Sequence, residues 1–307
     1  MTRIVLSGFI TAMFAVLYIN DGVMTPVPHN RCAKLLFKSG FEKGVYLGEP
    51  YNDGGGCWFQ DVKGSDNDEF TWPITFWGTS GTFQVLVDSS LNPENYIRNK
   101  IITVKGYDGN PTRVMFSRIL KADKGCTQDP YIMMDAVEEG DLYVSYRLKF
   151  PEDLAKLLGD SSNDDGWCTF FEWKTSGDYR IAAYVYVDEG APYWYVHGDN
   201  VAKDRYGRYR EFWEEENKSL PVPENKWFLV EIFWHRSKGK DGRFWWAIDG
   251  HVVADHHGPN KKSRPINRIM LFTVYSGQYP LTQWVDDIEI WDGFPYGEGK
   301  SCYIYKK

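Results

Sequence analysis

Basic residues are not in excess in this chain of 307 residues, and this absence argues against a nucleic-acid-binding domain. There are 35 Lys and Arg against 42 Asp and Glu, which gives a formal net charge of −7. A polyanionic ligand would need a local basic cleft on this acidic background, so it is a less favoured interpretation. We expect no nucleic acid among the partners.

Long apolar runs are also missing beyond the N-terminus, so no second segment is predicted to span a membrane. Residues 4–19 form an apolar run after one early positive charge at Arg3, which favours a secretory signal. No A-x-A pattern precedes residues 20–22, so an uncleaved anchor is the alternative. We expect a signal or anchor over 1–22, a linker over 23–34, a single domain over 35–307, and an extracellular or periplasmic location.

Cysteine is scarce, and none of the five forms a C-x-x-C pair, which argues against a cysteine metal site. Disulfides are the default in a secreted protein. Cys32 and Cys302 lie near the two ends of the mature chain and could pair, and Cys57 with Cys126 is a second plausible pair. Cys168 is predicted to be a buried thiol rather than a nucleophile, because no His or Asn constellation points to it.

Helical patterns are nearly absent, with one short candidate over Pro151–Leu158, and there is no internal repeat or low-complexity segment. Strand-like runs with turns at short spacing dominate instead. They predict an all-β fold, a two-sheet antiparallel jelly-roll sandwich. The expected strands cover residues 35–42, 101–105, 112–119, 141–150, 167–174, 179–188, 193–197, 227–236, 243–249 and 251–254, and residues 44–56 and 64–73 are interpreted as loops.

Residues 267–294 are interpreted as a hairpin, because two apolar runs, 268–274 and 284–291, flank a polar and aromatic loop. The run over residues 141–150 alternates cleanly and is predicted to be a half-buried antiparallel strand.

Aromatic residues are abundant, at 17% with 13 Trp and 20 Tyr. Flat aromatic rings often line sugar-binding clefts, although a large aromatic core would account for about half of them. Alternation over residues 179–188 places Arg180, Ala182, Tyr184 and Tyr186 on one face and apolar residues on the other. A guanidinium beside two phenols would suit a sugar acid.

A β-elimination at a uronic acid needs a group that neutralises the carboxylate, a base and an acid. Arg180 or Gln278 is the candidate for the first, because a guanidinium pairs bidentately with a carboxylate. Tyr275 or His197 is the candidate base or acid, and Tyr184 stands beside Arg180 on the same predicted face. The alternatives are a solvated sheet surface or a sugar-binding surface without catalysis.

Further candidates for substrate binding are Tyr186, Trp194, Arg205 and Arg208. The stretch over 205–210 interleaves cations with aromatics, although three Glu at 214–216 follow and could neutralise it. A glycoside hydrolase would need two carboxylates about 5 Å apart. Asp287 and Glu289 are formally eligible, but their strand is expected at the edge of the sandwich.

Four motifs in order, GFEKG (40–44), GDLYVSYRLKF (140–150), DYRIAAY (178–184) and VYSGQYPLTQWVDDIEIW (274–291), resemble a concanavalin A-like jelly-roll group. The group includes the fungal cellulose-induced jelly-roll protein and glucuronan lyases of polysaccharide lyase family 20. The resemblance implies that Arg180 matches a family arginine, whereas Tyr184 replaces a Gln and Asp178 replaces a His.

The same resemblance implies a structural calcium ion between Glu42 and Asp286 or Asp287, a chemistry that suits hard carboxylate oxygens. The alternative is that these acids face solvent. It also supports pairing of Cys57 with Cys126. The sequence thus predicts a secreted protein that engages a polysaccharide, with polyuronates as candidates, and cleaves it as a lyase, with non-catalytic sugar binding as the alternative. No protein partner is evident, and a monomer is expected.

Overall fold

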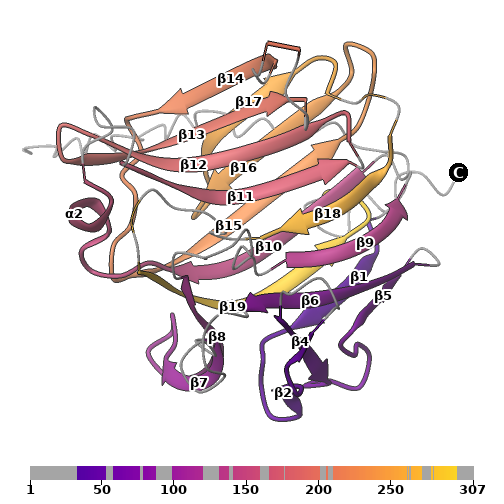
Figure 1. Ribbon diagram of the computed structural model, residues 1–307, viewed down its shortest axis with the longest axis vertical. Helices are drawn as coiled ribbons and strands as arrows, with labels where there is room; N and C mark the ends of the chain where they lie inside the picture. The colour runs from indigo at the N-terminus through magenta and orange to yellow at the C-terminus, as the bar shows by residue number, and fades with distance from the viewer. Residues whose placement is uncertain are drawn as a thin grey trace, which may run out of the picture.

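The computed structural model describes residues 33–52, 58–76, 79–87, 99–119, 131–137, 141–159, 166–175, 177–200, 205–206, 210–260, 262, 264–271, 278 and 280–295. Within these ranges the protein is built from two antiparallel β-sheets layered against each other (Figure 1). The predicted all-β antiparallel jelly-roll sandwich is confirmed.

The eight-stranded sheet has the order β17 (His251–His257), β16 (Arg243–Ile248), β15 (Trp227–His235), β10 (Asp141–Lys149), β19 (Leu281–Trp291), β8 (Pro111–Ile119) and β7 (Lys100–Lys105), with β1 (Leu35–Ser39) also paired to β19. The eleven-stranded sheet has the order β14 (Glu211–Asn217), β13 (Ala191–Asp199), β12 (Arg180–Asp188), β11 (Trp167–Thr175), β18 (Ile266–Met270), β9 (Tyr131–Val137), β6 (Thr79–Val87), β4 (Trp58–Gly64) and β2 (Val45–Leu47). Strand β3 (Tyr51–Asn52) pairs with β4, and β5 (Ile74–Phe76) pairs with β6.

The core between the sheets is rich in aromatic rings, as the abundance of Trp and Phe allows. Phe170 of β11 lies 5.0 Å from Trp194 and 5.1 Å from Trp246, measured between ring centroids. Trp194 and Trp246 come from opposite sheets and meet edge-on at 5.4 Å. Such edge-to-face pairs add about 0.5–1.5 kcal/mol each to their burial, so part of the aromatic excess is structural.

Cys168 lies in this core with its side chain completely buried, which confirms its predicted burial. The other four cysteines and the segment 1–22 lie outside the described residues, so the disulfides and the signal or anchor stay predictions. Among the described residues, no helix is both long and apolar enough to cross a bilayer.

The predicted hairpin over residues 267–294 is wrong. Its first half forms β18, which pairs with β11 and β9 in the eleven-stranded sheet. Its second half forms β19, which lies between β10 and β8 in the eight-stranded sheet. Each strand packs one face into the core between the sheets. Two apolar runs that are close in sequence therefore belong to opposite sheets.

Two expectations about burial and position are also corrected. Strand β10 is buried on both faces over its first six residues, because Tyr143 on its outer face is covered by Phe233, Trp245, Trp291 and Phe294. Strand β19 is interior to its sheet rather than at its edge. The loop expected over residues 44–56 contains the short strands β2 and β3.

The predicted helix is confirmed over a shorter span. The only helix within the described ranges is α2 (Leu154–Leu158), which buries Leu154 and Leu158. The Asp153 side chain does not cap it, and Glu224 Oε1 instead accepts a hydrogen bond from the Ala155 backbone N–H at 2.6 Å.

Candidate functional site

The predicted alternation of β12 is confirmed, with Arg180, Tyr184 and Tyr186 partly exposed while their apolar neighbours are buried. The antiparallel register places a residue of β13 beside each of them on the same outer face of the eleven-stranded sheet. These pairs are Arg180 with Asp199, Ala182 with His197, Tyr184 with Tyr195 and Tyr186 with Tyr193. The candidate site is this face of β11, β12 and β13.

Arg180 is held in one orientation by two carboxylates. Its Nε and Nη2 donate to the two oxygens of Asp199 at 2.7 and 2.8 Å, and its Nη1 donates to Glu172 at 3.1 Å. Lys174 Nζ lies 2.8 Å from the same Glu172 oxygen. Burial alone would lower the pKa of Arg180, but the hydrogen bonds to Asp199 and the charge of Glu172 raise it. The two cations and two carboxylates balance, and the guanidinium plane is fixed.

His197 is 7% exposed and lies beside this ionic group. Its Nδ1 lies 3.3 Å from a Glu211 oxygen, and its Nε2 lies 3.7 Å from Asp199 Oδ2. The Nε2 atom is buried and has no hydrogen-bond partner among the described residues. Burial, followed by the positive charge of Arg180, lowers the pKa of His197. The imidazole is therefore neutral at neutral pH and able to accept a proton.

Tyr184 packs edge-on against His197, with 5.5 Å between ring centroids, and lies 5.8 Å from the Trp167 ring. Burial raises the pKa of the Tyr184 phenol, and the opposing effect of Arg180 is smaller. The phenol thus keeps its proton at neutral pH. A neutral imidazole and a protonated phenol stand side by side, next to a fixed guanidinium.

Four tyrosines continue this face away from the ionic group, and we call Tyr184, Tyr186, Tyr193 and Tyr195 the tyrosine platform. Tyr186 stacks on Tyr193 with 5.8 Å between ring centroids and an interplanar angle of 24°. Tyr195 meets Tyr186 edge-on at 5.5 Å, and its hydroxyl donates to Glu214 at 2.7 Å. The platform offers aromatic faces with polar edges, which is the surface that sugar rings require.

The other predicted site residues are distributed as follows. Tyr275 and Arg208 lie outside the described residues. Gln278 is partly buried and lies between β18 and β19 in the chain, and both of its chain neighbours lie outside the described residues. Arg205 is exposed and stacks its guanidinium 4.7 Å from the centre of the adjacent Tyr206 ring.

The predicted role of Trp194 in substrate binding is wrong. Its side chain points to the opposite face of β13 and is completely buried in the core. Alternation explains this, because Tyr193 and Tyr195 on either side face outward.

Five residues of the site were not predicted, namely Glu172, Lys174, Tyr193, Tyr195 and Asp199. Alternation along residues 167–174 and 193–197 would place most of them on one face. The sequence does not contain the register that sets Asp199 opposite Arg180, since pairing between strands is a tertiary property.

The predicted metal ligands Glu42, Asp286 and Asp287 lie together around Gly40. A methyl group on Gly40 would stand 3.3 Å from Asp287 Oδ1, 3.5 Å from Asp286 Oδ1 and 3.8 Å from Glu42 Cγ. The Thr112 hydroxyl lies 2.7 Å from Glu42 Oε1 and 3.2 Å from Asp286 Oδ2.

Crowding of these acids perturbs their ionisation. Burial, followed by the charge of Asp287, raises the pKa of Asp286 to about 7. Burial also raises the pKa of Asp287. Over the described ranges, no group of three or more His, Cys, Asp or Glu side chains is arranged so that it could hold a metal ion. A cation here would need further oxygen ligands.

The carboxylates considered for glycoside hydrolysis are on the other sheet. Glu289 already engages Lys38 at 2.8 Å and accepts a hydrogen bond from Trp291 Nε1 at 3.2 Å. Asp287 belongs to the acid group around Gly40. Their strand β19 is in the eight-stranded sheet, away from the candidate site.

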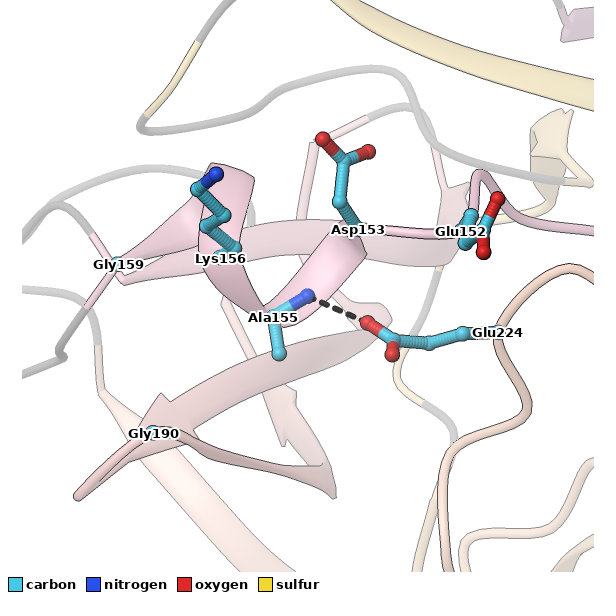
Figure 2. Close-up of a pocket in the computed structure, with 7 residues that line it drawn as sticks. All are labelled: Glu152, Asp153, Ala155, Lys156, Gly159, Gly190 and Glu224. Atoms are coloured by element: carbon cyan, nitrogen blue, oxygen red, sulfur yellow. Dashed lines mark hydrogen bonds between the residues drawn. The ribbon is translucent and has the colours of Figure 1, made fainter.

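A surface pocket lies at α2, lined by Glu152, Asp153, Ala155, Lys156, Gly159, Gly190 and Glu224 (Figure 2). In Figure 2 the Glu224 carboxylate points to the backbone of the helix, to which it is hydrogen-bonded. The lining has no aromatic side chain and no His, so this pocket offers neither a base poised near neutral pH nor a stacking surface for a sugar.

No family model matches this chain, and no curated protein matches it. Solved structures that match include a variant of alginate lyase Aly36B in complex with alginate trisaccharide, at 17% identity and TM-score 0.43, covering 64% of this chain and 85% of that one. Endo-β-1,4-glucuronan lyase from the fungus Trichoderma reesei matches at 10% identity and TM-score 0.44, covering 63% and 87%. The binding domain of Paraclostridial Mosquitocidal Protein 1 matches at 13% and 0.39, covering 67% and 45%.

At these identities the likeness concerns the fold alone. A glucuronan lyase and an alginate lyase are among the matched structures, in line with the resemblance stated from the sequence.

Proposed function

We propose that this protein binds an acidic polysaccharide along the tyrosine platform and cleaves it at a uronic acid by β-elimination. The observation that carries the proposal is the contact of His197 with Tyr184, with 5.5 Å between ring centroids, beside the fixed guanidinium of Arg180. The lowered pKa of His197 and the raised pKa of Tyr184 give a base and an acid in the required protonation states.

In this mechanism the charge of Arg180 stabilises the negative charge that develops on the uronate carboxylate. His197 removes the proton from the carbon next to the carboxylate, and that electron pair forms the new carbon–carbon double bond. The bond to the glycosidic oxygen breaks, and the leaving oxygen takes the proton of the Tyr184 hydroxyl. Transfer of a proton from the imidazolium to the tyrosinate, directly or through water, then restores both residues.

The nearby Asp199 supports the base. Its Oδ2 lies 3.7 Å from His197 Nε2, so its charge favours the imidazolium that forms during proton removal. Arg180 opposes that effect, and its charge is shared between two carboxylates. The substrate carboxylate therefore competes for the guanidinium with Asp199 and Glu172.

The test uses purified protein incubated with glucuronan, with alginate and with a neutral glucan as control. Ultraviolet absorbance of the unsaturated uronate product should rise on at least one polyuronate and not on the glucan. His197→Gln and Tyr184→Phe should each abolish the rise while leaving the unfolding temperature within a few degrees of the parent. New reducing ends without the ultraviolet absorbance would indicate hydrolysis and contradict the proposal.

Sugar binding without catalysis is a second candidate, and the double engagement of Arg180 by Asp199 and Glu172 favours it. In that case the tyrosine platform alone would carry the function. Retention on an insoluble polysaccharide, with no product from any soluble polyuronate, is the expected result for this candidate.

We further propose that a calcium ion binds among Glu42, Asp286 and Asp287. It would offset the mutual repulsion of these acids and join the segment that follows β1 to β19. The convergence of the three side chains at Gly40 supports this proposal. We also propose that the protein acts outside the cytoplasm, for which the apolar run over residues 4–19 is the support.

A further inference from the structure

A row of alternating aromatic and cationic side chains crosses the eight-stranded sheet on the side opposite the candidate site. The strand register sets Trp227 beside Lys149, Lys149 beside Trp284, Trp284 beside Phe116, and Phe116 beside Lys100. We call these five residues the lysine–aromatic row. It runs over β15, β10, β19, β8 and β7 (Figure 1).

The row faces away from the core. The neighbouring row in the same register, Leu148, Val285, Met115 and Ile101, packs into the core. Successive side chains of a strand point to opposite faces, so the lysine–aromatic row points outward. Lys100 is exposed, and the other four residues keep part of their surface accessible.

Contacts within the row fix its rings in place. Lys149 Nζ lies 5.5 Å from the centre of the Trp284 ring, and the rings of Phe116 and Trp284 are 5.5 Å apart at an angle of 55°. Trp227 Nε1 donates a hydrogen bond to the Lys105 backbone oxygen at 2.9 Å. The aromatic faces are thus presented by strands and not by loops, which makes them a rigid surface.

The row is positively charged on a chain whose net charge is −7. It contains two lysines and no acid. Arg118, two residues after Phe116 and on the same face, adds a third cation, and its Nε is buried without a hydrogen-bond partner among the described residues. Arg147 lies 3.9 Å over the exposed Tyr107 ring beside the row, but it also interacts with Asp287, so it contributes less.

We propose that the lysine–aromatic row is a second polysaccharide-binding surface, which takes a carboxylated chain and takes no part in its cleavage. The row crosses five neighbouring strands, and the end of β7 folds back to Trp227 of β15, so the accessible surface is shorter than the strand spacings alone would give. The rings would contact the apolar faces of sugar units, and the cations would pair with their carboxylates. Charge complementarity selects the acidic glycan as the occupant.

The experiment measures binding of the full-length His197→Gln variant to soluble alginate and glucuronan by affinity electrophoresis, so that cleavage does not interfere. Adding K100Q/K149Q should weaken binding about tenfold and reduce its sensitivity to salt, because two screened charge contacts are lost. The matched control is K238Q/K240Q, two exposed lysines in the turn between β15 and β16, which should leave binding unchanged.

Measuring cleavage distinguishes the proposed second surface from the proposed lyase function. With His197 intact, K100Q/K149Q should reduce turnover of the polymer but not of a short oligouronate. If the protein is not a lyase, no variant will form product, and the binding measurement will still test the second surface. Equal binding with and without K100Q/K149Q would contradict the proposed second surface. Binding to phosphatidylserine vesicles without binding to the polyuronates would also contradict it.

Discussion

His197 and Tyr184 show how one packing arrangement sets opposite roles for two titratable groups. Burial disfavours the charged form of each, so it lowers the pKa of the imidazole and raises that of the phenol. The same desolvation therefore yields a neutral base and a protonated acid on adjacent strands. Burial alone accounts for the direction of both pKa shifts.

The first prediction concerns the pH dependence of this pair. The His197 imidazole should titrate below its ordinary value of 6.5, so kcat/KM should rise with pH through that lowered pKa and be level at neutral pH. Titration of the His197 ring proton signals by NMR checks this without any substrate. A His197 pKa above 6.5 would contradict the assignment of a neutral base.

The second prediction concerns the ion pair between Arg180 and Asp199. Asp199→Ala leaves a buried guanidinium with one carboxylate fewer, and breaking a buried pair costs about 3–5 kcal/mol. Denaturant unfolding measures the loss. The control is Asp188→Asn, whose solvent-exposed pair with Lys218 should contribute little to stability. Equal effects of the two substitutions would show that the pair does not hold the site together.

Strands carry the site because antiparallel pairing brings side chains from distant parts of the chain into one row. The alternation of β12 is read directly from residues 179–188, and β10, β11, β15 and β16 agree closely with the predicted strands. Strand β14 was missed because Glu-rich runs are poor strand formers, and it forms at the edge of its sheet. The sheet membership of β18 and β19 could not be predicted, since both halves of residues 267–294 satisfy the pattern of a hairpin.

The third prediction concerns the packing of β13. A methyl group on Gly198 would clash with Trp213 Nε1 and the Tyr179 hydroxyl, which are hydrogen-bonded to each other at 2.7 Å. Gly198→Ala should therefore destabilise the protein by about 1–3 kcal/mol in thermal unfolding. Gly293→Ala is the matched control, because its added methyl group would stand 3.5 Å from Ala33, an ordinary contact. A neutral Gly198→Ala would show that β13 does not need this close approach.

At the scale of the whole molecule, the two outer faces differ in character. The face of the eleven-stranded sheet carries titratable groups beside the tyrosine platform, whereas the face of the eight-stranded sheet carries the lysine–aromatic row and the acid group around Gly40. Chemistry on one face and attachment on the other would let a polymer be held and cleaved by the same chain.

The fourth prediction concerns metal removal. If calcium binds among Glu42, Asp286 and Asp287, adding it should raise the unfolding temperature and a chelator should reverse the gain. Asp286→Asn should abolish the effect, whereas Asp188→Asn, at the exposed end of β12, should preserve it. An unfolding temperature that is the same with calcium and with chelator would rule out a structural ion at this place.

The most direct test of the central claim is the mass of the product formed from a defined oligouronate. The parent protein should yield a product with a new non-reducing end that is lighter by one water than a hydrolysis product, and His197→Gln should yield no product. Products with the full mass of hydrolysis, or unchanged β-elimination by His197→Gln, would contradict this claim.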